Sequence, residues 1–109
     1  MIGETLAAVQ VLVARGEVRV SEHGYDELAK DGIFVADVLA GVAAAVVVED
    51  YPGAERGPSV LVLQKDATGA AIHVVWGIPK GRKAPAVVIT AYRPDPERWS
   101  SDFMRRKKP

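Results

Sequence analysis

Two neighbouring apolar runs decide the fold, Ser59-Val-Leu-Val-Leu-Gln-Lys-Asp66 and Ile72-His-Val-Val-Trp-Gly-Ile78. They are rich in valine and other residues that favour the pleated surface of a β-strand. Similar runs flank them at Ala45–Tyr51 and Ala86–Tyr92, and glycine, proline or aspartate bounds each one. The sequence therefore predicts four strands.

The connections between these strands are short. They span residues 52–58, 67–71 and 79–85. Such lengths suit antiparallel hairpins, because a parallel crossover needs about a dozen residues or more. An antiparallel meander is the simplest topology that satisfies them.

The segments before the strands have helical character. Helix formers fill Thr5–Arg15, and the apolar residues of Glu22–Asp31 and Ile33–Val42 recur at helical spacing. A short alternating run, Glu17–Val20, suits an edge strand, and Ser21 can cap the helix that follows it. The pattern predicts an α+β fold in which N-terminal helices pack on one face of a four- to five-stranded antiparallel sheet.

Length and composition limit the alternatives. The 109 residues suit a single domain, and 49% hydrophobic against 26% charged residues is a globular balance. The absence of cysteine excludes disulfides and a cysteine nucleophile, so we expect a cytoplasmic protein. The longest apolar stretch, Leu6–Ala14, is too short to span a bilayer, and we expect no membrane partner.

Charge is unevenly distributed although the net charge is zero. Residues 1–55 carry ten acidic and three basic side chains, whereas residues 56–109 carry four acidic and eleven basic ones. The basic half can attract a polyanion such as RNA. The simpler alternative is that the two halves pack together and neutralise each other.

Several motifs resemble one bacterial family. They are Ser21-Glu-His23, Asp31-Gly32-Ile33, Ile72-His73-Val74-Val75 and Thr90-Ala-Tyr92-Arg-Pro-Asp-Pro96. Their order is similar to that of the family called domain of unknown function 4258, over about residues 20–99. An additional N-terminal helix within residues 1–16 and a basic tail, residues 100–109, lie outside this family-like core.

The resemblance implies a RelE/BrnT-like fold, since that family is grouped with small RNA-cleaving toxins whose two helices lie against a curved antiparallel sheet. It implies an activity less strongly, because one fold carries many functions. The first of the paired helices also departs from the family pattern, which often has arginines there. Here it holds Asp26 and Glu27, with Lys30 as its only base, so we expect weaker polyanion contact from this helix.

Three residues are candidates for proton transfer. His23 lies in the first turn of a helix, where the helix dipole disfavours imidazolium and leaves a neutral ring able to act as a base. His73 lies mid-strand on the less bulky face, and Tyr92 closes the last strand with a phenol that can donate or accept a proton. Each has a structural alternative, because a histidine or tyrosine often only satisfies a neighbouring polar group.

Four residues are candidates for substrate contact. Arg93 can hold two phosphate oxygens, Thr90 shares a strand face with Tyr92, and Lys80 and Arg82 make the loop after the third long strand basic. The alternatives are a bridging arginine at the end of the strand, in a rigid turn where Asp95 or Glu97 pairs with a neighbouring arginine, and a loop whose charges serve solubility. The sequence has no nucleotide-binding motif or metal-ligand spacing, so we expect no cofactor and no metal.

Two functions remain open. The first is a metal-independent endoribonuclease of toxin type, in which the ribose 2′-hydroxyl attacks the adjacent phosphate. RNA and an antitoxin-like protein would be its partners. The second is a non-catalytic binding or assembly module that keeps the fold. We also expect a homodimer with the first helix at its interface, because Gln10 is the only polar side chain between Leu6 and Ala14. Alternatively, this helix packs against Val75 and Thr90 within one chain.

Overall fold

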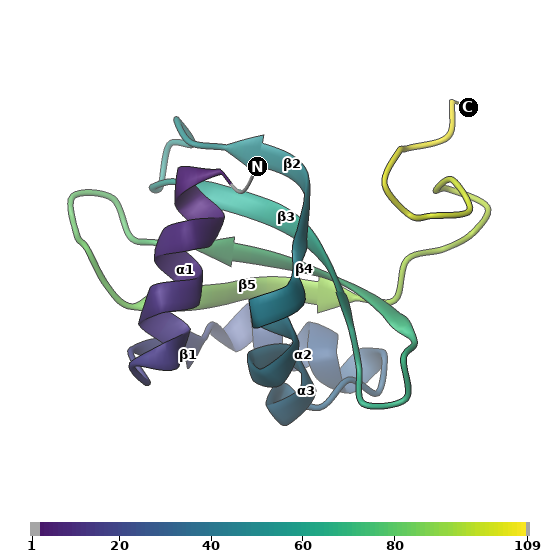
Figure 1. The fold of residues 1–109 in the computed structure, drawn as a ribbon, viewed down its shortest axis with the longest axis horizontal. Helices are drawn as coiled ribbons and strands as arrows, with labels where there is room; N and C mark the ends of the chain where they lie inside the picture. The colour runs from purple at the N-terminus through teal and green to yellow at the C-terminus, as the bar shows by residue number, and fades with distance from the viewer. Residues whose placement is uncertain (1–2, 109) are drawn as a thin grey trace.

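Three helices and one sheet make up the computed structural model, which describes residues 3–108 (Figure 1). The helices are α1 (Glu4–Ala14), α2 (Glu22–Lys30) and α3 (Val35–Gly41), and a short 3-10 turn, η1 (Val42–Ala44), follows α3. The strands are β1 (Val18–Val20), β2 (Val46–Tyr51), β3 (Ser59–Lys65), β4 (Ala71–Gly77) and β5 (Ala86–Tyr92). Every predicted element is present, which confirms the α+β class.

The sheet is mixed, with strand order β1-β5-β4-β3-β2. Strands β2 to β5 form the predicted antiparallel meander. β1, however, runs parallel to β5, with Val18 opposite Ala86 and Val20 opposite Val88, so the prediction of a wholly antiparallel sheet was wrong. Loop length restricts only strands that follow one another along the chain, and two helices and three strands separate β1 from its partner.

The two faces of the sheet differ because side chains alternate along each strand. On β4, Ile72, Val74 and Trp76 are fully buried in the core that the helices cover, whereas His73 and Val75 point to the opposite side, here called the open face. The helices contribute mainly aliphatic side chains to the core, namely Leu6, Val9, Leu12, Leu28, Val38 and Val42.

One polar side chain lies inside this core with all its bonds made. The Gln64 Oε1 accepts a hydrogen bond of 2.9 Å from the Trp76 indole, and its Nε2 donates one of 2.9 Å to the Val38 carbonyl. A buried amide is stable only when such partners exist. The bonds tie β3 to both β4 and α3 and fix how the helix sits on the sheet.

Helix α1 crosses the three central strands (Figure 1). Leu6 and Val9 are completely buried, and Val11 is half-exposed. Part of the apolar surface expected at a dimer interface is therefore covered within one chain, and the homodimer stays a prediction. The alternative packing against Val75 and Thr90 differs from the structure, since α1 lies on the Val74 and Val88 side of the sheet.

The chain after β5 forms a small separate hairpin, seen in yellow beyond the end of that strand in Figure 1. Trp99 and Arg106 form an isolated bridge, and the Lys107 amide donates to the Arg98 carbonyl at 2.8 Å. Trp99 is only 4% exposed, as expected for a docked aromatic residue. The basic segment is thus hydrogen-bonded to the start of the hairpin through Lys107.

Candidate functional site

His73 and Tyr92 meet on the open face because they are direct partners across β4 and β5. The Tyr92 hydroxyl lies 3.1 Å from His73 Nδ1, and the Phe103 carbonyl oxygen lies 2.8 Å from Nε2. A carbonyl oxygen can only accept, so we assign the ring proton to Nε2 and let Nδ1 accept from the tyrosine. Both ring nitrogens of His73 are therefore occupied.

The surroundings of this pair keep it neutral. His73 has no exposed surface, and the Trp99 ring stands edge-on to it with centroids 4.5 Å apart. Burial lowers the pKa of the His73 imidazole and raises the pKa of the Tyr92 phenol. In each case burial disfavours the charged form. At neutral pH the pair is a hydrogen-bonded unit without charge.

An ion pair closes the site above His73. Arg106 donates to the two carboxylate oxygens of Glu49 at 3.0 and 2.9 Å, and its guanidinium stacks over Trp99 at 4.7 Å. The Tyr51 hydroxyl also donates to Glu49. Hydrogen bonds from Arg106 and then Tyr51 hold the pKa of Glu49 below its ordinary value. The hairpin is thus held by one bidentate, charge-assisted contact.

A hollow of about 470 Å³ occupies another part of the open face, and we call it the basin. Gly77, Val87 and Ile89 form its apolar floor. Its other lining residues come from β1, the cap and first turn of α2, the loop before β3 with the first residue of that strand, and the loop after β4, namely Arg19, Ser21, His23, Ala54, Arg56, Gly57, Pro58, Ser59, Ile78 and Pro79. Three of these residues, Arg19, His23 and Arg56, bring cationic or titratable groups.

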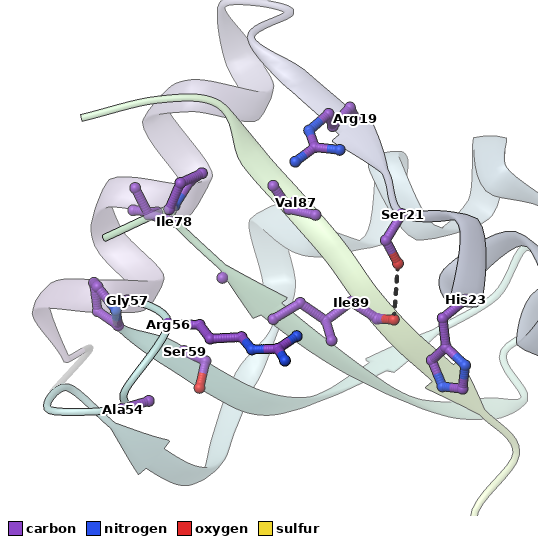
Figure 2. Close-up of a pocket in the computed structure, with 13 residues that line it drawn as sticks. Arg19, Ser21, His23, Ala54, Arg56, Gly57, Ser59, Ile78, Val87 and Ile89 are labelled. Atoms are coloured by element: carbon purple, nitrogen blue, oxygen red, sulfur yellow. Dashed lines mark hydrogen bonds between the residues drawn. The ribbon is translucent and has the colours of Figure 1, made fainter. Parts of the chain in front are cut away.

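Figure 2 shows the guanidinium groups of Arg19 and Arg56 and the imidazole of His23 around the floor residues Val87 and Ile89. Within residues 3–108, neither arginine has a carboxylate oxygen within 4.0 Å. His23 Nε2 lies 3.9 Å from the Glu27 carboxylate, and its side chain is 64% exposed. The basin therefore presents two free guanidinium groups and an accessible imidazole above an apolar surface.

The loop that carries Arg56 is fixed by main-chain contacts. The Lys80 amide donates to the Arg56 carbonyl and the Ile78 amide to the Pro58 carbonyl, each at 3.0 Å. Gly57 between them has a φ of +121°, and a Cβ there would lie 2.1 Å from the Ile78 oxygen. Only glycine allows this approach, which places Arg56 at the basin rim.

His23 is set in place by the start of α2. Ser21 caps that helix, accepting a 2.9 Å hydrogen bond from the Gly24 amide, and its hydroxyl donates to the Ile89 carbonyl at 3.1 Å. A Cβ on Gly24 would lie 2.7 Å from the Val88 oxygen, so the helix starts in close contact with β5. Serine and glycine here bring the first turn, and His23 with it, to the edge of the basin.

The candidate site residues fall into separate groups. His73 and Tyr92 are together, half-buried Thr90 lies opposite Val75 on the same face, and His23 belongs to the basin. Lys80 and Arg82 are exposed on the loop after β4 and do not line the basin.

Arg93 lies with neither group. Its side chain makes a 3.0 Å ion pair with Asp66, and its amide donates to the Asp31 carboxylate at 2.8 Å. These contacts match the structural alternative considered for Arg93, and they anchor the end of β5.

Sequence reasoning missed Arg19 and Arg56. Arg19 is one of the two polar residues of the alternating run Glu17–Val20 and the only one within β1, which marks it as outward-facing. Arg56 is the only base in the loop of residues 52–58 and precedes Gly57, the residue that lets the loop approach the sheet. Those signals were present, but nothing local in the sequence indicates that the two arginines face the same hollow.

Comparisons with known proteins identify the family. Neither the curated proteins nor the solved structures contain a significant match to the chain. Within residues 3–108, no group of three or more acidic or histidine side chains could hold a metal ion, and no helix is long and apolar enough to cross a membrane. A family model matches residues 20–93, which include α2, α3, β2 to β5 and Arg56 but not Arg19. The chain belongs to the family described as Domain of unknown function (DUF4258).

Proposed function

We propose that this chain is a metal-independent RNA-cleaving domain of RelE/BrnT type, and that the basin holds the scissile phosphodiester. The observation that carries the proposal is the meeting of Arg19, Arg56 and His23 around one apolar-floored hollow. Guanidinium groups without a carboxylate partner are suited to phosphate oxygens, and they stabilise the charge that develops on phosphorus substituents during transfer.

In this mechanism His23 takes the proton of the ribose 2′-hydroxyl. The 2′-oxygen then bonds to phosphorus, the bond from phosphorus to the 5′-oxygen breaks, and the leaving oxygen takes a proton from water in the exposed basin. Arg19 and Arg56 hold the non-bridging oxygens. The products are a 2′,3′-cyclic phosphate and a free 5′-hydroxyl, and no cofactor is needed.

Binding is tested with a fluorescent single-stranded RNA of about 15 nucleotides. We expect Arg19→Ala and Arg56→Ala each to weaken binding about tenfold, the effect of losing one charge-assisted contact. The slope of log K against the logarithm of the salt concentration should become less steep by about 0.7 for each phosphate contact that is lost. Arg15→Ala, an exposed arginine at the end of α1, is the control and should bind as wild type. Equal loss in all three variants would contradict a site in the basin.

Cleavage is tested by the same RNA on a sequencing gel. Wild-type protein should give products with cyclic phosphate ends, and His23→Gln should bind RNA normally without cutting it. RNA that is bound through the arginines but never cut would favour the second function, a non-catalytic binding module. The position of His73 favours that alternative, because both its nitrogens are occupied and it is shielded from substrate.

The two proposed partners, RNA and an antitoxin-like protein, are supported to different degrees. RNA is supported by the basin, and the salt and substitution series above tests it. An antitoxin-like protein would cover the open face, and it is testable as a partner that competes with RNA for Arg19 and Arg56. The exposed bases Lys80 and Arg82 remain candidate contacts for the flanking RNA backbone.

A further inference from the structure

The C-terminal hairpin, residues 98–107, is held in shape by its own bonds. The Ser100 amide donates to the Arg105 carbonyl at 2.8 Å, the Ser100 hydroxyl donates to Asp102 at 2.6 Å, and the Met104 amide donates to the same carboxylate at 3.1 Å. A segment that is ordered before it docks loses less conformational entropy on binding. The hairpin therefore has the properties of a preformed ligand.

The surface that receives the hairpin recognises three of its features. His73 donates to the Phe103 carbonyl, and Trp99 packs against the His73 ring. The Glu49 carboxylate accepts two hydrogen bonds from the Arg106 guanidinium. Trp99, which is only 4% exposed, is the kind of buried anchor that dominates binding between separate proteins, whereas the Arg106 side chain is 62% exposed and adds a charged contact at the rim. The contact has the character of an interface between a groove and a ligand.

The boundary of the hairpin coincides with an anchored residue. Arg93 is fixed by Asp31 and Asp66, and the family match also ends at residue 93. From Pro94 onward, the described chain contacts the rest of the molecule mainly through the three features above. A turn at Asp95 precedes the hairpin, and in this turn the Arg98 amide donates a hydrogen bond to the Asp95 carbonyl at 2.9 Å. The hairpin can therefore leave as one body if the chain reorients at Pro94.

We propose that the His73 surface is a binding groove for this hairpin, and that a second copy of the chain can supply it, so that two copies exchange hairpins. The groove is incomplete without the hairpin, because His73 Nε2 and Glu49 would lose their partners. Exchange of an identical element is a low-cost route to a dimer, since the same contacts form in both states. The proposal is independent of RNA cleavage.

A charge-exchange experiment tests this directly. Glu49→Arg reverses the charge of the groove and Arg106→Glu reverses the charge of the hairpin. In either variant, a hairpin docked in the groove of its own chain places two like charges together. When the two are mixed, each groove faces a hairpin of opposite charge from the other chain. By light scattering we expect the mixture to show twice the mass of either separate sample. Wild type should not exchange hairpins at micromolar concentration, because a short tether gives the hairpin in its own chain an effective concentration on the order of millimolar.

The double variant Glu49→Arg with Arg106→Glu is the folding control, since it restores opposite charges within one chain and should have the mass and the tryptophan emission of wild type. A second measurement uses a labelled peptide of residues 95–108, which should bind Arg106→Glu at least tenfold more tightly than wild type, whose groove is filled. No increase in mass on mixing, together with no peptide binding to a folded Arg106→Glu variant, would overturn the proposal.

Discussion

His73 hydrogen-bonds Tyr92 through one ring nitrogen and the Phe103 carbonyl through the other, and so links β5 to the C-terminal hairpin. Of the two neutral tautomers, only the one with its proton on Nε2 makes both bonds, because the Phe103 carbonyl can only accept. Protonation of this buried ring would reverse the hydrogen bond to the Tyr92 hydroxyl and place a charge beneath the hairpin. This histidine makes docking of the hairpin depend on pH.

The pH dependence has a defined sign. Burial lowers the pKa of His73 in the folded protein, so the unfolded chain gains this proton first as the pH falls through about 6.5. The folded state then binds fewer protons, and the free energy of unfolding decreases towards acid. We expect the contribution of His73 to be complete above pH 7 and lost progressively below it, with exposure of Trp99 measured by fluorescence.

Two glutamine variants isolate this effect. His73→Gln can keep a donor and an acceptor but does not titrate, so its thermal midpoint should change less between pH 7.5 and about pH 5.5 than that of wild type. His23→Gln removes the exposed histidine of the basin and should keep the wild-type profile. The assignment would be wrong if His23→Gln, and not His73→Gln, flattened the curve.

Gly57→Ala should disturb the basin more than any other change in the loop of residues 52–58. The positive φ and the 2.1 Å approach of a Cβ to the Ile78 oxygen cannot both be relieved without moving the loop. We expect a loss of about 2 kcal/mol in unfolding free energy and weaker RNA binding, because Arg56 moves with the loop. Gly53→Ala is the matched control, since a Cβ there meets nothing within 4 Å. Chemical denaturation of both variants makes the comparison, and equal stabilities would contradict it.

The elements of the fold could be predicted because their signals are local. Valine-rich runs bounded by turn residues gave the four long strands, and the predicted cap Ser21 does start α2. The parallel pairing of β1 with β5 could not be predicted, because it joins residues that are distant in sequence and no loop length restricts it.

The candidate site was less predictable than the fold. The pairing of His73 with Tyr92 follows from the strand register, and the sequence already marked both residues. The role of Arg93 was not decided by its residue type, because Asp66 and Asp31 reach it from distant loops. The basin forms where β1, α2 and the loop of residues 52–58 meet in the folded protein. No single stretch of sequence indicates that these three segments lie together.

The buried bond between Gln64 and Trp76 should be a measurable coupling. Gln64→Leu leaves the Trp76 indole N–H without its acceptor in a fully buried position, and we expect a loss of about 2 kcal/mol in unfolding free energy. Adding Trp76→Phe removes the orphaned donor, so the double variant should lose less than the two single losses combined. Urea unfolding of wild type, the two single variants and the double variant measures this coupling free energy, which we expect to lie between about 0.5 and 3 kcal/mol. Additive losses would show that the bond contributes nothing.

Ser21 allows stability to be separated from RNA binding, because its hydroxyl caps α2 and also lines the basin. Ser21→Ala removes the cap and should cost about 1 kcal/mol in unfolding free energy. Ser21→Asn and Ser21→Asp both keep a capping oxygen and should be closer to wild type in stability, but only aspartate adds a negative charge beside Arg19 and His23. We therefore expect RNA affinity to fall at least tenfold in Ser21→Asp relative to Ser21→Asn, most strongly at low salt, where the repulsion is least screened.

Thermal unfolding gives the stability of each Ser21 variant, and fluorescence anisotropy on the same samples gives its RNA affinity. Equal RNA affinities for the aspartate and asparagine variants would show that no phosphate lies in the basin near Ser21, and the proposed site would have to be abandoned.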